Sequence, residues 1–280
     1  MEKEAKELLE KEKYDVMDLV RIVTLLRRPG GCPWDREQTH ESIRKNLIEE
    51  TYEVIEAIDK KDLKLLREEL GDLLLQVVFH AEMEAEAGHF TFDDVAGDIC
   101  RKLIHRHPHV FGEVRAENSD RVLENWEAIK NEEKHRDTVA DKLMAVPRQL
   151  PALMRAAKVG KKSGVLDFPD TDSALLKVRE ETGEAAEAIA GKDAGAVEEE
   201  VGDLLFAAAN LARKASVDPE EALTRATDKY IRRFSILEGI CLKKRKEMAL
   251  CSPEELDFIW EEAKKIEKSK KNADFSESSY

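Results

Sequence analysis

The stretch 47–78, LIEETYEVIEAIDKKDLKLLREELGDLLLQVV, decides the fold of this chain. Its apolar residues recur at helical spacing on both sides of a short polar break at 59–62, and it contains no proline. Nothing in the stretch interrupts helical hydrogen bonding, so the pattern predicts two helices joined as an antiparallel hairpin. Sustained period-2 alternation is missing from all 280 residues, so we expect an all-α protein.

The same pattern returns later as VREETGEAAEAIA at 178–190 and EEEVGDLLFAAA at 198–209. Sixteen residues separate Glu53 from Glu69 in the first copy, and sixteen separate Glu184 from Glu200 in the second. Further features recur in the same order, namely Lys102/Arg106 with Lys229/Arg233 and Trp126/Lys130 with Trp260/Lys264. This internal repeat predicts two tandem homologous helical-bundle domains, each with its own hairpin.

The domain boundaries follow from composition and proline placement. We expect an N-terminal domain over 14–137 and a C-terminal domain over 152–265. The polar stretch 138–151, which ends in a segment with two prolines, is expected to be a linker. Apolar periodicity is lost over 266–280, which we expect to be a flexible tail.

Four carboxylates of each hairpin are spaced so that they can converge. Helix residues three apart share a face, and in an antiparallel pair residues equidistant from the turn lie at the same height. The eight residues are Glu50, Glu53, Glu69 and Asp72, centred on residue 61, and Glu181, Glu184, Glu200 and Asp203, centred on residue 192. Gly71 and Gly202, each inside the second helix of a hairpin, indicate a close approach of helices.

Facing carboxylates repel one another, and a hard cation with oxygen ligands removes that repulsion. Mg²⁺ prefers such ligands and bridges to phosphates, and two ions about 3.5–4 Å apart would suit in-line phosphoryl displacement. A solvated acidic face is the alternative for either pair alone, but the symmetry and the recurrence favour a metal site. The cations Lys229 and Arg233 suit triphosphate oxygens. Trp260 suits either core packing or stacking on a base.

Charge and cysteine content limit the function and the location. The net charge of −14 argues against a nucleic-acid-binding surface. No apolar run approaches the roughly 20 residues of a membrane span, and the charged N-terminal segment lacks the apolar core of a signal peptide. The four cysteines form no C-x-x-C pair. We therefore expect a cytoplasmic protein with reduced thiols, no membrane association and no direct nucleic-acid binding.

Several segments closely resemble MazG, a family of nucleoside triphosphate pyrophosphohydrolases. Besides the two hairpins they are GCPWDREQTHESI at 31–43, HRHPHVFGEV at 105–114, ENWEAIK at 124–130, LPALMRAAKVGKK at 150–162 and DKYIRRF at 228–234. The resemblance covers roughly 15–265. It implies all-α bundles that dimerise around the acidic cleft, and Mg²⁺-dependent hydrolysis of NTPs and dNTPs, ATP among them, to the monophosphate and pyrophosphate.

The resemblance also implies roles for particular residues and makes the C-terminal domain the main catalytic one. Metal would bind Glu181, Glu184, Glu200 and Asp203, with Glu50, Glu53, Glu69 and Asp72 as the set of the N-terminal copy. Catalytic roles would fall to Glu180, Glu181, Lys229 and Arg233. Substrate would contact Lys177, Val178, Arg179, Glu180, Glu181, Ala196, Val197, Glu198, Glu199, Asp203, Lys229, Arg233 and Trp260. Phe168 stands where relatives often have a G-F-D-W-like segment, which affects the expected base preference.

The expected reaction is attack of an activated water on the α-phosphorus, in line with the leaving pyrophosphate. A cluster glutamate would take the proton, and the sequence does not separate Glu180 from Glu181 in this role. An apolar stripe at 73–78 predicts a homodimer that buries it. Two alternatives stay open, a nucleotide-binding regulatory protein without turnover and a structural adaptor with solvated acidic faces.

Overall fold

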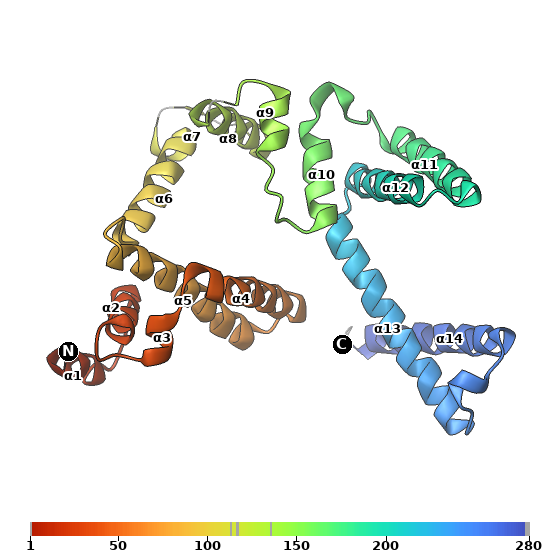
Figure 1. Cartoon of the computed structure of the whole chain (residues 1–280), viewed down its shortest axis with the longest axis horizontal. Helices are drawn as coiled ribbons and strands as arrows, with labels where there is room; N and C mark the ends of the chain where they lie inside the picture. Colours follow the sequence, from red (N-terminus) through yellow and green to blue (C-terminus); the bar gives the residue numbers. More distant parts are fainter. Residues whose placement is uncertain (1, 113, 116–117, 135, 278–280) are drawn as a thin grey trace. The chain divides into compact units, whose positions relative to one another are not determined.

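The computed structural model describes residues 2–112, 114–115, 118–134 and 136–277, and every regular element in these ranges is a helix (Figure 1). The chain divides into two compact units, Met1–Lys130 and Asn131–Tyr280, and the division falls within helix α8. The expected all-α class with two tandem domains is confirmed.

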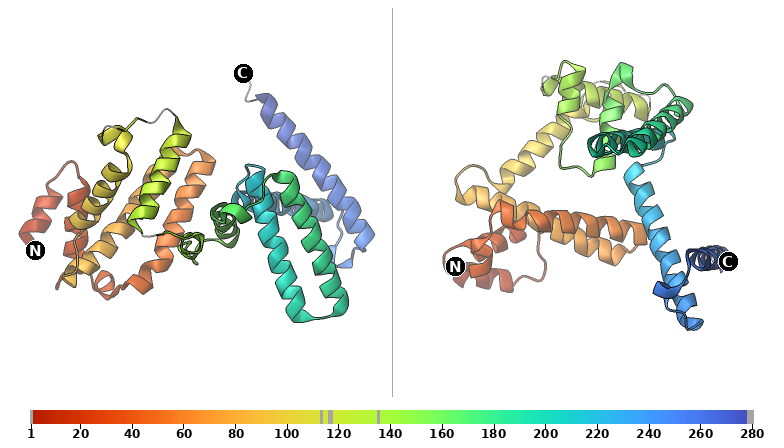
Figure 2. Two further views of the ribbon diagram at one scale, coloured as in Figure 1. Left: turned by 90° about the horizontal axis from the view of Figure 1, so that it is seen from above. Right: turned by 45° about the vertical axis from the view of Figure 1, so that its right-hand side comes forward.

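The first unit is built around the predicted hairpin of α4 and α5, which lie side by side in antiparallel orientation (Figure 2). Its helices are α1 (Glu2–Leu9), α2 (Val16–Arg27), α3 (Pro33–Glu37), α4 (His40–Lys60), α5 (Leu63–Glu86), α6 (Phe92–Arg106), α7 (Pro108–Phe111) and α8 (Ser119–Glu133). The core joins α2, α4 and α5 through Val23, Ile43, Val78, Phe79 and Met83. Val78 is therefore a core residue and not part of an exposed stripe, in contrast to the sequence expectation.

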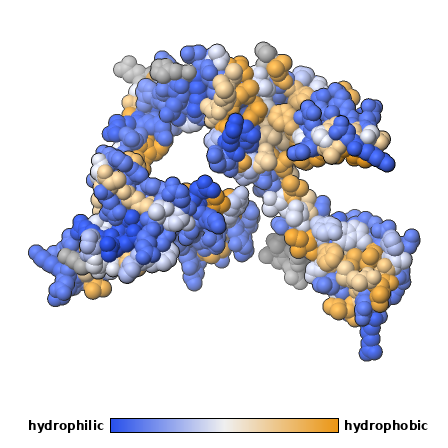
Figure 3. All heavy atoms as spheres, viewed as in Figure 1, coloured by the Kyte–Doolittle hydropathy of each residue, from blue (hydrophilic) through white to orange (hydrophobic). Residues whose placement is uncertain are grey.

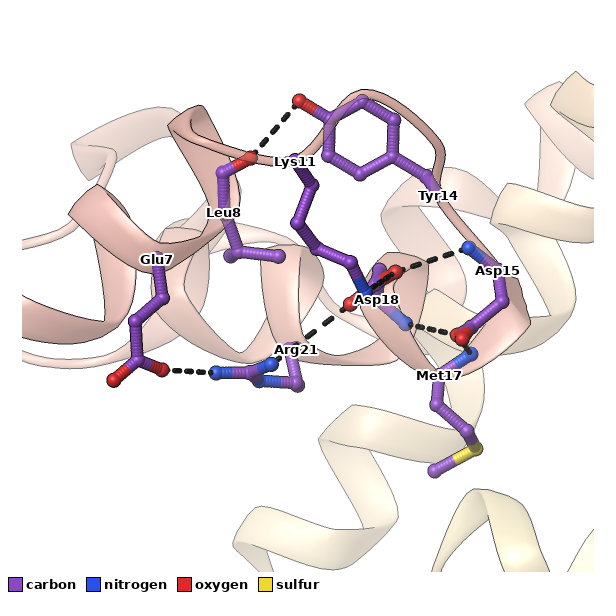
Figure 4. A network of polar contacts seen from close by, with 8 residues as sticks. All are labelled: Glu7, Leu8, Lys11, Tyr14, Asp15, Met17, Asp18 and Arg21. Carbon is purple, nitrogen blue, oxygen red and sulfur yellow. Dashed lines mark hydrogen bonds and ion pairs between the residues drawn. The ribbon is translucent and has the colours of Figure 1, made fainter.

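A polar network fixes α1 to the start of α2 (Figure 4). Asp18 is 2% exposed, accepts a hydrogen bond from the Asp15 backbone and forms ion pairs with Lys11 and Arg21. Asp15 in turn caps α2 by accepting from the backbone N–H of Asp18, so the two side chains form a capping box. This network attaches the N-terminal segment to the scaffold that supports α5.

Both hairpin turns use the same local device. Lys61 and Lys192 adopt left-handed backbone conformations, with φ of 54° and 57°, and end the first helix of each hairpin. The next residues, Asp62 and Asp193, accept hydrogen bonds from backbone N–H groups at the start of the second helix. The repeat seen in the sequence is thus a repeat of turn geometry, which sets the register of the carboxylates in both copies.

The second unit contains the hairpin of α11 and α12, and α13 packs against α14. Its helices are α9 (Val139–Met144), α10 (Ala152–Lys162), η1 (Gly164–Leu166), α11 (Thr171–Gly191), α12 (Ala194–Lys214), α13 (Pro219–Lys243), η2 (Met248–Leu250) and α14 (Pro253–Glu277). The α13–α14 core contains Leu237, Ile240, Cys241, Ile259 and Ala263. Helix α10 approaches α12 at Gly160, where a Cβ would lie 1.7 Å from Asn210 Oδ1.

The stretches expected as linker and tail both contain helical residues. The stretch expected as a linker, 138–151, contains helix α9, which Thr138 caps. The stretch expected as a tail, 266–280, begins inside α14, because Glu267 is buried against α13 and pairs with Arg233. Helix α14 continues to Glu277, and residues 278–280 lie outside the described residues.

Candidate metal and nucleotide site

The first hairpin brings three of its four predicted carboxylates together. One oxygen each from Glu50, Glu69 and Asp72 lies within 4.8 Å of the other two. Glu53 adjoins this group, since its charge acts on both Glu50 and Glu69. Glu50 and Glu53 come from α4 and the other two residues from α5, as the spacing about residue 61 predicts.

The second hairpin assembles a related but different triplet, with Glu184 in place of the counterpart of Asp72. One oxygen each from Glu181, Glu184 and Glu200 lies within 4.8 Å of the other two. Asp203 is exposed and is not part of this triplet in the described chain. Lys177 lies one helical turn before Glu181 and forms ion pairs with Glu180 at 2.8 Å and with Glu181 at 2.7 Å. The sequence analysis did not identify this pairing, although the i,i+4 spacing was a signal for it.

The carboxylates repel one another electrostatically. Burial, followed by the charges of Asp72 and Glu53, raises the pKa of Glu50. Burial and then the charge of Glu53 raise the pKa of Glu69. In the second copy burial and then Glu181 raise the pKa of Glu184, while Lys177 acts in the opposite direction. Hydrogen bonds to Glu180 and Glu181 raise the pKa of Lys177. Each site therefore favours an added positive charge.

The donor set fits a hard divalent cation. Glu181 has a side chain that is 5% exposed, and its Oε1 is paired with Lys177. Its other oxygen, Oε2, is buried without a hydrogen-bond partner among the described residues. A buried anionic oxygen without a partner is costly, and a cation held by Glu181, Glu184 and Glu200 would satisfy it. All three donors are carboxylate oxygens, the ligand type that Mg²⁺ and Ca²⁺ prefer over nitrogen or sulfur.

The residues expected at the nucleotide fall into two groups. Those on the hairpin lie on the two helices that carry the triplet: Lys177, Val178, Arg179, Glu180 and Glu181 on α11, and Ala196, Val197, Glu198, Glu199 and Asp203 on α12. Lys229, Arg233 and Trp260 lie on α13 and α14. In the described part of a single chain, no ion pair links Lys229 or Arg233 to the triplet, and Arg233 Nε pairs instead with Glu267 Oε2 at 2.7 Å.

Trp260 packs against the α13–α14 core, with its ring centroid 5.2 Å from that of Tyr230. Its counterpart Trp126 has a different environment. The Arg106 guanidinium lies 5.1 Å from the Trp126 ring centroid, and Lys130 Nζ lies 4.4 Å from it. Cation–π contacts of this kind stabilise the pair. The two tryptophans are thus equivalent in the sequence repeat but have different partners.

Both hairpins expose apolar side chains. In the first they include Ile48, Tyr52, Ile55, Leu70, Leu74 and Val77, and in the second Leu176, Ile189, Val201, Leu205 and Phe206. Figure 3 shows hydrophobic surface among hydrophilic residues over the second hairpin. A Cβ at Gly71 or Gly202 would meet no atom within 4 Å. The expected close approach of helices at these glycines is therefore not made within one chain.

An acidic helix hairpin, present twice in an all-α chain, defines a class of helical proteins whose carboxylates could hold a metal ion. The model of the MazG nucleotide pyrophosphohydrolase domain matches residues 38–111 and 170–235, which contain the two hairpins. This chain belongs to the MazG nucleotide pyrophosphohydrolase family. None of the described helices combines the length and apolar character needed to cross a membrane.

Relatives match along most of the chain. A nucleoside triphosphate pyrophosphohydrolase of Escherichia coli K12 is 44% identical over 256 residues, which are 89% of this chain and 97% of that protein. A nucleoside triphosphate pyrophosphohydrolase/pyrophosphatase MazG of Thermotoga maritima is 43% identical over 249 residues, 88% of this chain and 94% of that protein. The Bacillus subtilis protein YabN is 44% identical over 250 residues, 88% of this chain and 51% of its own length.

Proposed function

We propose that the chain hydrolyses nucleoside triphosphates to the monophosphate and pyrophosphate in nucleotide-pool housekeeping, with Mg²⁺ held by the acidic triplets. The observation that carries the proposal is the buried, unpartnered Oε2 of Glu181 within a triplet of carboxylates. Membership of the MazG family supports the reaction class. Relatives that match nearly 90% of the chain are named nucleoside triphosphate pyrophosphohydrolases, which supports triphosphates as substrates.

Glu181, Glu184 and Glu200, together with Asp203, would hold the metal in the second copy. Bound Mg²⁺ would neutralise the triphosphate charge and make an attacking water more acidic. Lys177 keeps Glu181 in position through their ion pair. Glu180, which shares Lys177, or Glu181 would accept the proton of the attacking water. Lys229 and Arg233 would stabilise negative charge on the leaving pyrophosphate, and Trp260 would contact the nucleotide.

Product analysis tests the reaction. Incubation with ATP and dNTPs plus Mg²⁺ should release the monophosphate and pyrophosphate in equal amounts, because attack falls on the α-phosphorus. A diphosphate and free phosphate as the first products would contradict the proposal. Binding of nucleotide without any product would favour the alternative, a regulatory protein that does not turn over its ligand.

We also propose a cytoplasmic homodimer that does not bind nucleic acid. The exposed apolar side chains of the hairpins support the dimer, since patches of this kind are commonly buried in partner contacts. The net charge of −14 supports the absence of a nucleic-acid surface. The N-terminal copy has the four acids at equivalent sequence positions, and we assign it the secondary role by resemblance to MazG.

A further inference from the structure

A chain of titratable side chains lies at the open end of the first hairpin, away from the acidic triplet. His40 is the first residue of α4, and His80 lies on α5. The two Nδ1 atoms are 2.7 Å apart, and the rings are parallel to within 2°. Glu84 contacts His40 Nε2 through Oε1 at 2.7 Å and His89 Nδ1 through Oε2 at 2.6 Å.

The contacts determine where the protons lie when both rings are neutral. The Glu84 carboxylate only accepts hydrogen bonds, so His40 donates through Nε2. Nδ1 of a neutral His40 must then accept, and Nδ1 of His80 must donate. This leaves Nε2 of His80 without a proton. That atom is buried and has no hydrogen-bond partner among the described residues, which suits the unprotonated state.

The first added proton keeps the contact between the rings but leaves an N–H on the buried Nε2 of His80, and the second breaks the contact. A first proton on His40 makes both of its nitrogens donors, so His80 has to carry its proton on the buried Nε2, where no acceptor lies in the described structure. A second proton places N–H groups on both Nδ1 atoms, which face each other at 2.7 Å. Burial, followed by the charge of His40, lowers the pKa of His80. Hydrogen bonds from His89 and His40 lower the pKa of Glu84, which stays ionised.

Two neighbouring carboxylates, Glu82 and Glu86, contact residues of α2, and a third, Glu41, interacts with His40 through its charge. On α5, Glu86 pairs with Arg27 of α2, and Glu82 accepts a hydrogen bond from Thr24 of α2. On α4, Glu41 lies in the first turn, and its negative charge interacts electrostatically with His40. Glu84 is therefore the anion in direct contact with the histidine pair, and it is shared with His89.

In the second hairpin, the start of α11 contacts the end of α12 through a threonine instead of a histidine pair. A shift of 131 residues, which relates Glu53 to Glu184, places Thr171 and Leu211 at the positions of His40 and His80. Thr171 is the first residue of α11, and its Oγ1 donates to the backbone carbonyl of Lys214 at 3.2 Å. A threonine hydroxyl does not titrate between pH 5 and 8, so this contact is insensitive to pH in that range.

We propose that His40 and His80 form a pH-sensitive latch, which holds the start of α4 against α5 near neutral pH and releases it when the rings are protonated. A histidine with a lowered pKa contributes stability that is present above its unfolded pKa of about 6.5 and is lost as the pH falls. The latch acts on the hairpin that bears Glu50 and Asp72, and α11–α12 serves as an internal control. It does not depend on the activity of either copy.

Hydrogen exchange of the full-length chain tests the latch. Amide protection factors, corrected for the intrinsic pH dependence of exchange, are compared at pH 7.5 and 5.5 for peptides covering 40–47 and 171–178. Release of one histidine to a pKa of about 6.5 favours the open state at pH 5.5 by up to about 10-fold, the limit reached when the closed state binds no proton. We expect protection over 40–47 to fall by more than 2-fold and up to about 10-fold, while 171–178 changes less than 2-fold.

His80→Gln and His40→Gln should each remove this pH dependence, and the control His109→Gln, on α7, should retain it. His40→Gln provides the test if His80→Gln does not fold, because the His40 side chain is 42% exposed. NMR titration of the histidine rings gives a second readout, in which His80 should titrate below its ordinary range. Unchanged protection over 40–47 between the two pH values, or the same loss in wild type and both latch variants, would overturn the proposal.

Discussion

At the scale of single residues, the two acidic sites differ in the side chain one helical turn before the first glutamate of each site. Lys177 pairs with Glu181 in the second copy, whereas Asn46 stands at the equivalent position of the first. The second site therefore contains its own counter-charge, and the first does not. This difference gives a structural reason to expect unequal behaviour from two sites whose carboxylates come from equivalent sequence positions.

Glu200→Gln and Glu69→Gln form a matched pair at equivalent positions of the two triplets. If the second copy is the main site, Glu200→Gln should lower kcat/KM at least ~100-fold, which is a loss of about 2.7 kcal/mol in transition-state stabilisation. Glu69→Gln should cost less than about 5-fold. Steady-state assays at saturating Mg²⁺ measure both, with circular dichroism to verify folding. The reverse order of losses would reassign the main site to the first copy.

The raised pKa values of Glu50, Glu69 and Glu184 predict how Mg²⁺ affects stability. A carboxyl with a raised pKa destabilises the folded state once ionised, so its unfavourable effect grows as the pH rises above its unfolded value of about 4.3. Bound Mg²⁺ removes that effect. The increase in Tm on adding Mg²⁺ should therefore be larger at pH 7.5 than at pH 5.0, as measured by differential scanning fluorimetry.

A matched control for the Mg²⁺ experiment is Glu41→Gln, a substitution of a first-turn glutamate of α4 outside the triplet. It should leave the Mg²⁺-dependent shift in Tm unchanged, whereas Glu50→Gln should reduce it. A shift of equal size at both pH values would argue that the added metal binds elsewhere.

Residue spacing predicted which carboxylates meet, because the i,i+3 rule and the symmetry about the turn depend only on helix geometry. Spacing gave no information on burial. The buried Glu181 and the exposed Asp203 look equivalent in the sequence and differ in the structure. Spacing also does not distinguish the His40–His80 contact, although these residues are nearly equidistant from the turn, because helix geometry alone gives no sign that two rings are hydrogen-bonded.

At the scale of helices, the hairpin glycines illustrate where sequence reasoning fails. Glycine in a helix interior was interpreted as a sign of close approach, and one chain shows open space at both Gly71 and Gly202. The actual close approach is at Gly160, where α10 meets Asn210 of α12. Close packing depends on the relative placement of helices distant in sequence, and the local pattern of a single helix does not contain that information.

Substitution by alanine distinguishes these glycines. Gly202→Ala should raise the free energy of unfolding by about 0.5–1 kcal/mol, because alanine favours the helix and its Cβ meets no atom of the chain. Gly160→Ala should lower it, because its Cβ would lie 1.7 Å from Asn210 Oδ1. Urea unfolding followed by circular dichroism measures both. Destabilisation by Gly202→Ala would indicate a neighbour on that helix face.

At the scale of the whole molecule, exposed apolar surface is the main indication of assembly. Leu205 on α12 is 53% exposed, and we expect it to be buried in a homodimer. Leu205→Lys should shift the chain to a monomer, whereas Leu9→Lys, a matched change on α1 in the first unit, should not. Light scattering coupled to size-exclusion chromatography measures the mass. A fully active wild-type monomer at micromolar concentration would contradict the dimer.

The repeat predicted the two-unit organisation, and the apolar periodicity predicted the helices. The sequence did not predict that α14 continues past residue 265, because its polar composition resembles a tail. Past residue 265, Ile266 packs against the α13–α14 core and the buried Glu267 pairs with Arg232 and Arg233, the latter 34 positions away. Long-range pairs of this kind are not visible in a local composition window.

The two capped hairpin turns have a consequence for how the protein is made. Each turn joins partners that are close in sequence, and helical proteins dominated by such local contacts fold in microseconds to milliseconds. A ribosome adds about 5–20 residues per second, so synthesis of the 150 residues of the second unit takes roughly 8–30 seconds. The first hairpin therefore has ample time to close before its homologous copy emerges, which separates in time two sequences similar enough to pair wrongly.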